Sequence, residues 1–268
     1  VAFPTNIKAD YVFAQGQFDV IKRAIKKPDY TLYDEIPMSE APMNSFVDIS
    51  DGGDGVALLN TGLKAYEAAD DEERTVYLSL LRAFPLRICV TSDMQDYSGL
   101  DKGSQSLGKS TFRYAFMPHG GDWEEANVWG ESEKFNLIFS AVQLAPTSHG
   151  KNALAHSFVE LNTDRLNVSA IKKSEDKEGY VIRLFNPSDK TVKAAVRLNG
   201  GIAPTEKTQS PLERQKAEFE LPEYSGKKWS KASLVSLEEK EVAPLEIDEN
   251  GFCEFEITGK KILTIKFC

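Results

Sequence analysis

The chain has 268 residues, of which 41% are hydrophobic and 10% aromatic, enough apolar side chain to bury a core and to exclude wholesale disorder. A formal net charge of -9 without a long basic run excludes the electrostatic footprint of a nucleic-acid-binding protein. No apolar run reaches the roughly 18 residues of a membrane span. Three scattered cysteines favour a reducing, cytoplasmic compartment. Because the sequence begins at Val1 and not at methionine, we expect a fragment of a longer protein.

Period-two alternation of apolar and polar residues, the pattern of β-strands, runs through the first half of the chain. Residues 75–83 (TVYLSLLRA) are apolar on both faces, which predicts a strand buried between layers. Residues 111–119 place Phe112, Tyr114 and Phe116 on one face of another strand. Further strands are predicted at residues 11–25, 46–49 and 56–59.

One short helix is predicted near residues 123–136, in the stretch DWEEANVWGESEKFN. Asp122 is a favourable N-cap residue, and Glu125, three positions later, completes a capping box. The first turn is acidic, as the helix dipole prefers. Residues 64–74 are acidic and weakly patterned, and we interpret them as a loop or a frayed turn.

The second half of the chain has shorter strands with outer faces rich in lysine and glutamate. A turn-rich loop at residues 144–152 precedes them, which predicts a domain boundary near His156. We therefore predict a mainly β fold, with a large antiparallel β-sandwich (a supersandwich) at residues 1–156 and a smaller β-sandwich at residues 157–268. The strands expected in the second part are 167–171, 180–185, 191–198, 216–221, 234–237 and one on each side of Gly259.

The stretch FVDISDGGDGVALLNTG, residues 46–62, contains three aspartates and four glycines and raises the question of a calcium loop. An EF-hand loop that began at Asp48 would need acidic or amide residues where Ser50 and Gly52 stand, and a glutamate where Leu59 stands. A catalytic carboxylate pair would need burial that raises one pKa, and nothing in the stretch supplies it. We predict a hairpin with a tight turn, one of whose aspartates also contacts a ligand.

Other chemical signatures are weak. The histidines His119, His149 and His156 lack the spacing of a zinc site. His119 lies between a predicted strand and the helix, where either a functional residue or a polar loop residue is expected. The sequence contains no G-x-S-x-G nucleophile elbow and no phosphate-binding loop. We therefore expect no catalytic residue, metal site or cofactor within this chain.

Four longer strings carry a resemblance to a known family. They are SFVDISDGGDGVALLNTGLKAYE, YLSLLRAF, SLGKSTFRYAFMPHGGDW and VSAIKKSEDKEGYVIRLFNPS, followed by a terminal ILTIKF. In this order they resemble the C-terminal region of glycoside hydrolase family 38, the α-mannosidases and mannosylglycerate hydrolases, and look closer to its bacterial branch. The matching positions are Asp48, Ser50, Asp51, Gly55, Ala57, Leu59, Asn60, Leu80 to Ala83, Gly108, Phe112, Tyr114, Ala115, Pro118, His119, Lys172, Lys173, Glu175, Asp176, Gly179 and Arg183.

This resemblance implies a parent enzyme that is a retaining, metal-assisted α-mannosidase active in mannose metabolism. Its nucleophile, acid/base and zinc ion would lie in an N-terminal catalytic domain that is missing from this chain. The resemblance implies that the sandwiches pack on that domain and lend loops to the rim of its active site, where an α-mannoside or other glycan binds. Several residues are candidates for contacts at this rim or with the missing domain. For each of them a purely structural role in turn formation, strand capping or surface charge is an equal alternative. The candidates are Asp48, Asp51, Asn60, Lys64, Tyr66, Arg82 and His119.

Arg82 is singled out because an arginine in an apolar strand needs a partner, and Asp48 is one candidate. Two alternatives to the accessory role stay open. One is a free-standing carbohydrate-binding or adhesion β-sandwich, and the other is a structural module that forms homo-oligomers through an apolar face. No nucleic-acid or membrane partner is expected.

Overall fold

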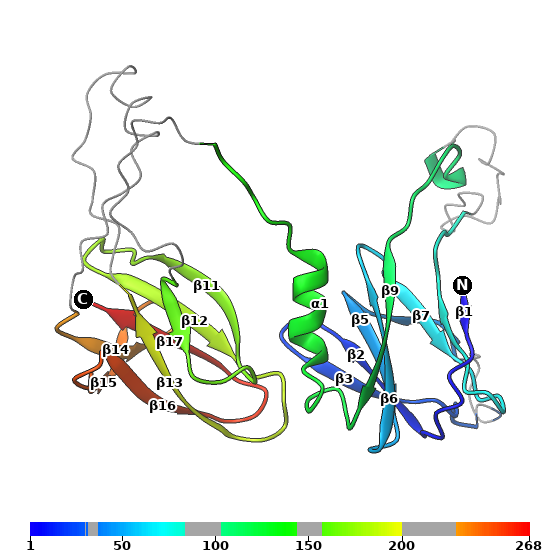
Figure 1. Ribbon diagram of the computed structural model, residues 1–268, viewed down its shortest axis with the longest axis horizontal. Coiled ribbons are helices and arrows are strands. Elements are labelled where there is room, and N and C mark those ends of the chain that lie inside the picture. Colours follow the sequence, from blue (N-terminus) through cyan, green and yellow to red (C-terminus); the bar gives the residue numbers. More distant parts are fainter. Residues whose placement is uncertain (30, 32–36, 84–102, 144–156, 200–228) are drawn as a thin grey trace. The chain divides into compact units, whose positions relative to one another are not determined.

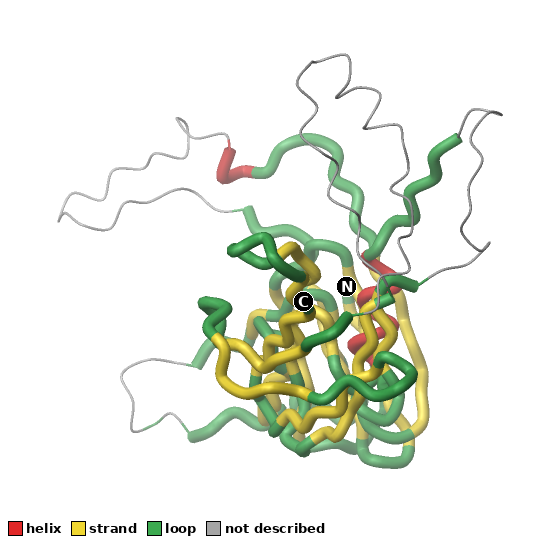
Figure 2. The backbone as a smooth tube through the Cα atoms, turned by 90° about the vertical axis from the view of Figure 1, so that its left-hand side faces the viewer, coloured by secondary structure: helices red, strands yellow, loops and turns green. Residues whose placement is uncertain are grey.

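The computed structural model describes residues 1–29, 31, 37–83, 103–143, 157–199 and 229–268. The described chain forms two compact units, Val1–Ile138 and Phe139–Cys268. The boundary expected near His156 falls in residues 144–156, which are outside the described residues. Strands make up most of the regular structure in both units (Figures 1 and 2).

The first unit contains two antiparallel sheets. The five-stranded sheet has the order β3-β2-β5-β6-β9, with β2 Tyr11–Gln15, β3 Val20–Ala24, β5 Phe46–Ser50, β6 Asp54–Asn60 and β9 Tyr114–Gly120. The four-stranded sheet has the order β1-β8-β7-β4, with β1 Ala2–Phe3, β4 Ala41–Pro42, β7 Ala65–Ala68 and β8 Val76–Leu78. A 3₁₀ turn, η1, spans Gly103–Gln105.

A single apolar core lies between these two sheets. Val47, Ile49 and Leu58 from the five-stranded sheet are in the same buried cluster as Tyr66 and Leu78 from the four-stranded one. Every residue of β5 is buried, because its opposite face is covered as well. There Phe46 meets Trp129 of the helix α1 edge to face, at 6.1 Å between ring centroids. The predicted antiparallel β-sandwich is confirmed.

The capping box forms, but the helix begins later than predicted. The Asp122 carboxylate accepts hydrogen bonds from the backbone N–H groups of Glu124 and Glu125, and the Glu125 carboxylate accepts one from Asp122 N–H at 3.2 Å. These bonds close a turn that ends at Asn127, whose left-handed backbone (φ 47°) interrupts it. Asn127 is the N-cap of α1, Val128–Asn136, and its side chain accepts from Gly130 N–H.

Two predicted strands of the first unit are shorter than expected. Residues 11–25 form a hairpin of two strands, β2 and β3, which turns where Gly16 N–H donates to the Asp19 carbonyl. Residues 75–83 contain only the three-residue strand β8, which pairs with two residues of β1 on one side and with three residues of β7 on the other. Tyr77 and Leu81 are 39% and 55% exposed, so the expectation of a strand buried on both faces is wrong.

The second unit is also a sandwich of two antiparallel sheets. One has the order β10-β13-β16, with β10 Val159–Leu161, β13 Val192–Leu198 and β16 Phe252–Ile257. The other has the order β11-β12-β17-β14-β15, with β11 Asn167–Lys173, β12 Tyr180–Phe185, β14 Ala232–Val235, β15 Glu241–Leu245 and β17 Ile262–Phe267. The strand predicted at residues 216–221 lies outside the described residues.

The core of the second unit draws on both of its sheets. Ile182, Leu184 and Ile265 from one sheet share a buried cluster with Val196 and Ile257 from the other. Trp229 belongs to the same cluster, and its indole N–H donates to the Leu198 carbonyl at 2.9 Å. No helix within the described part of the chain is long and apolar enough to span a membrane.

Candidate functional site

The turn between β5 and β6 is held by an aspartate that acts on its own backbone. Oδ1 of Asp51 accepts hydrogen bonds from the N–H groups of Gly53 at 2.9 Å and Asp54 at 3.0 Å. Gly52 has φ 92°, which glycine adopts without strain. These hydrogen bonds hold the pKa of Asp51 below its ordinary value. The residue itself is exposed to solvent. The predicted hairpin and tight turn are therefore confirmed.

A buried ion pair lies beside this turn. Asp48 of β5 is fully buried, and its Oδ2 is 2.7 Å from Nε2 of His119 on β9. The other oxygen, Oδ1, accepts a hydrogen bond from the Ser50 hydroxyl at 2.9 Å. Both oxygens of this buried carboxylate thus have a partner inside the protein, as a buried charge requires.

The pair forms because β6 carries a glycine at the crossing point. β6 lies between β5 and β9 in the sheet (Figure 1), and the strand register places Gly55 directly opposite His119. A Cβ on Gly55 would be 2.2 Å from Cε1 of His119. The imidazole therefore lies over the bare backbone of β6 and reaches Asp48 on the far side. Gly53 O also accepts from Gly121 N–H at 2.9 Å, which joins the turn to the chain after β9.

Burial and pairing shift the pKa values of both partners. Burial raises the pKa of Asp48 above its ordinary 3.8, against the hydrogen bonds from His119 and Ser50. For His119 burial acts to lower the pKa, but the hydrogen bond and the negative charge of Asp48 outweigh it and hold the pKa above 6.5. The Gly120 carbonyl and Asp122 add to this rise.

The stability of the first unit is therefore expected to depend on pH through His119. Since the folded pKa lies above the unfolded value of about 6.5, the stabilisation is complete below pH 6.5 and is lost as the pH rises through the folded pKa. His119→Gln keeps a hydrogen-bond donor beside Asp48 and does not titrate, so its stability is expected to be flat over this range. NMR titration of the His119 ring, with urea unfolding at each pH, measures both. A folded pKa below 6.5 would contradict this expectation.

Asn60 and Lys64 lie at the other end of β6. Asn60 is fully buried, and its Nδ2 donates to the Asn44 carbonyl at 3.2 Å while its Oδ1 accepts from Leu63 N–H at 2.8 Å. These bonds shape the turn into β7. Lys64 is exposed, and its backbone carbonyl accepts from Met43 N–H. The structure does not bring these two residues next to Asp48 and His119.

Tyr66 and Arg82 are separate again. Tyr66 is 1% exposed within the core between the sheets, and its hydroxyl accepts a hydrogen bond from Arg23 at 3.3 Å. Arg82 is exposed and follows β8 outside any strand. The expectation of an Arg82 that lies in an apolar strand and pairs with Asp48 is wrong, because Asp48 binds His119 and Ser50.

The described residues contain no group of three or more His, Cys, Asp or Glu side chains that could hold a metal ion. His149 and His156 lie outside the described residues. Residue patterns alone did not reveal the role of Gly55. The sequence signal available for the buried site was the spacing of Asp48 and Ser50, which lie two positions apart and therefore on one face of a strand.

Each of the two units is a sandwich of two sheets, and the buried Asp48 carboxylate is hydrogen-bonded on both oxygens. These features define a β-sandwich protein whose buried polar groups are engaged within its own fold. The family follows from comparison with known proteins. Residues 1–85 match the profile of the glycosyl hydrolases family 38 C-terminal domain, and residues 165–265 match that of the glycosyl hydrolases family 38 C-terminal beta sandwich domain. These two matches cover more than half of the chain, which belongs to the C-terminal region of glycoside hydrolase family 38.

Individual relatives agree with this assignment. The chain is 29% identical over 146 residues to alpha-mannosidase G of Dictyostelium discoideum, a match that covers 53% of this chain and 12% of that protein. An alpha-mannosidase from Enterococcus faecalis V583 has the same fold, with a TM-score of 0.71 and 20% identity over 100% of this chain and 25% of that one. A family 38 protein from Enterococcus faecalis gives a TM-score of 0.70 at 19% identity, over 26% of its length. The chain thus spans about a quarter or less of the relatives it matches.

Proposed function

We propose that this chain is the C-terminal accessory β-sandwich region of a retaining, metal-dependent α-mannosidase-like glycoside hydrolase. In this proposal it packs on a catalytic domain absent from this chain and completes the rim of the active site, where an α-mannoside or other glycan binds. The observation that carries the proposal is that both ends of the chain match C-terminal domains of the family, while the chain aligns with only 25% of a solved α-mannosidase.

The chemistry of the described residues supports an accessory role. A retaining glycosidase uses two carboxyl groups about 5–5.5 Å apart across the scissile bond, one of them free to act as a nucleophile. Asp48 is the fully buried carboxylate of the described chain, and both of its oxygens are engaged by His119 and Ser50. It is therefore unsuited to attack a sugar. Its role in this proposal is to hold the β5–β6 turn in place.

The exposed candidates are the ones left to form rim or interdomain contacts. Asp51 is exposed at the turn beside His119, and Lys64 and Arg82 are exposed elsewhere on the first unit. Charged side chains at loops and strand ends suit contacts with sugar hydroxyls or with a neighbouring domain. Tyr66 and Asn60, which are buried and hydrogen-bonded within the unit, would act through the shape of the scaffold.

The proposal predicts that the chain alone does not hydrolyse 4-nitrophenyl α-D-mannopyranoside, with or without added zinc. The same chain, joined to the catalytic part of its parent, is expected to support zinc-dependent turnover. Circular dichroism in the presence of EDTA supplies the control, because the chain should fold without metal. Turnover by the isolated chain above the uncatalysed rate would refute the accessory role.

A further inference from the structure

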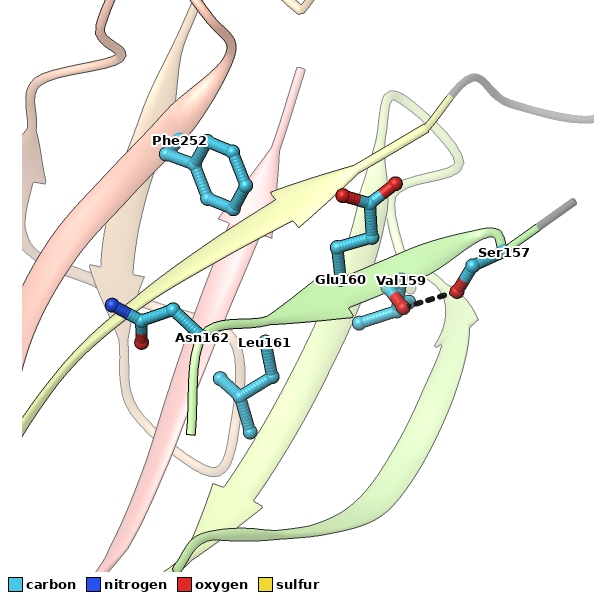
Figure 3. A pocket seen from close by; sticks show the side chains of 6 residues that line it. All are labelled: Ser157, Val159, Glu160, Leu161, Asn162 and Phe252. Atoms are coloured by element: carbon cyan, nitrogen blue, oxygen red, sulfur yellow. Dashed lines mark hydrogen bonds between the residues drawn. The ribbon is translucent and has the colours of Figure 1, made fainter. Parts of the chain in front are cut away.

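The second unit has a groove that the accessory role does not use. It has a volume of about 380 Å³, within the roughly 300–1,000 Å³ typical of small-molecule sites. Figure 3 shows the Glu160 carboxylate and the Phe252 ring on one side of β10 and the Leu161 side chain on the other. The lining residues are Ser157, Val159, Glu160, Leu161, Asn162 and Phe252.

One row of paired residues crosses the sheet beneath this groove. The strand register places Glu160 opposite Arg197, and Arg197 opposite Phe252. The Arg197 guanidinium donates to Oε2 of Glu160 at 2.6 Å, and its central carbon is 4.7 Å from the centroid of the Phe252 ring. The other carboxylate oxygen, Oε1, accepts from the Asn199 amide, and each oxygen keeps a further lone pair with which to accept from a ligand. The guanidinium also donates to the Asn250 carbonyl at 3.1 Å. The charges of Glu160 and Arg197 compensate each other, so the groove presents polar atoms without a net charge.

The next row provides a hydrogen-bond donor. Oδ1 of Asn162 accepts from the backbone N–H of Ala195 at 2.7 Å, which fixes the amide orientation. Among the residues that the structure describes, Nδ2 of Asn162 has no hydrogen-bond partner, and the side chain is exposed at the groove. Ala195 lies beside it on the same face of β13 as Arg197, and its small methyl group leaves room above the sheet.

We propose that this groove binds one pyranose ring of a neutral glycan. The ligand class follows from the lining. A sugar ring presents C–H bonds on one face, which suit the apolar surface of Phe252. Its hydroxyls both donate and accept, so they suit the Glu160 carboxylate as acceptor and the Asn162 amide as donor. A charged ligand would lack an unpaired counter-charge, because Glu160 and Arg197 already neutralise each other. The inference goes beyond the accessory role and does not depend on it.

The test is an NMR titration of the whole chain with three sugars: methyl α-D-mannopyranoside, methyl β-D-glucopyranoside and sodium glucuronate. We expect saturable shifts for the neutral sugars, with dissociation constants in the millimolar range typical of a shallow site with one aromatic contact. The shifts should be centred on the amides of Glu160, Asn162 and Phe252. Glucuronate should bind no more tightly than the neutral sugars.

Three variants separate the contacts. Phe252→Ala removes the ring and should weaken binding about tenfold, whereas Phe252→Tyr keeps the ring and should bind as the unaltered chain does. Asn162→Asp keeps an oxygen for the Ala195 N–H group but removes the outward donor, and about fivefold weaker binding is expected. Lys193→Ala is the matched control, because Lys193 lies on β13 outside the groove lining and is largely exposed, so its removal should leave binding unchanged.

Several results would overturn the proposal. These are no saturable shift with either neutral sugar, shifts centred elsewhere on the chain, and tighter binding of glucuronate. Binding that is unchanged in Asn162→Asp and Phe252→Ala would do so as well. If Phe252→Ala does not fold, the map on the unaltered chain and the Asn162→Asp variant still decide the question. The mannosidase assay tests the accessory role separately, since its outcome does not depend on whether this groove binds a sugar.

Discussion

Replacing Gly55 with alanine is expected to destabilise the first unit by about 3 kcal/mol, the low end of the cost of breaking a buried ion pair. The added methyl group would lie 2.2 Å from Cε1 of His119, so the imidazole must leave the space over β6. Asp48 would then stay buried without its partner. Urea unfolding followed by NMR signals of the first unit measures the change, and it keeps the two units of the chain separate.

Two further variants assign the loss to His119. Gly53→Ala is the matched control in the same hairpin, because its Cβ would meet only Asp51 Oδ1, at 3.5 Å, and it should change the stability by about 0.5 kcal/mol or less. In a His119→Ala background, Gly55→Ala should cost far less than in the unaltered chain, since the obstructing ring is gone. Equal costs in the two backgrounds would show that the glycine matters for another reason.

Replacing Asn186 with alanine is expected to destabilise the second unit by about 3 kcal/mol, because buried polar groups lose their partners. Asn186 is fully buried just after β12. Its Nδ2 donates to the carbonyls of Lys190 at 2.8 Å, Ile257 at 3.2 Å and Thr258 at 3.3 Å, and its Oδ1 accepts from Ser188 N–H. This one side chain therefore links the connection between β12 and β13 to the connection between β16 and β17.

The controls for Asn186 test the donor and the location. Asn186→Asp keeps the acceptor for Ser188 but places an oxygen against three carbonyls, so it should be at least as destabilising as the alanine variant. Asn250→Ala, at an exposed turn of the same unit, should change the stability by about 0.5 kcal/mol or less. NMR-detected urea unfolding of the second unit is the measurement. A small loss in Asn186→Ala would mean that water replaces the side chain.

Much of the candidate site followed from local sequence. Asp51 and the glycines after it predicted the turn, because an aspartate that bonds the N–H groups two and three residues later needs only its neighbours. The bonds between Asp122 and Glu125 were predicted in the same way, although Asn127 moved the start of the helix to Val128. Residues 75–83 were misread because an apolar residue on each face does not report which face another layer covers: Val76 and Leu78 are buried, whereas Tyr77 between them is exposed.

The sequence by itself determined the mainly β class and the family, because alternation and ordered motifs are properties of consecutive residues. Only the tertiary structure decided which distant groups meet. Asp48 and His119 are 71 positions apart and meet because the strand order places Gly55 between them, where no side chain intervenes. Likewise Glu160, Arg197 and Phe252 form one row only because β13 pairs with both β10 and β16. Strand order and register depend on packing of the whole sandwich, and no local pattern encodes them.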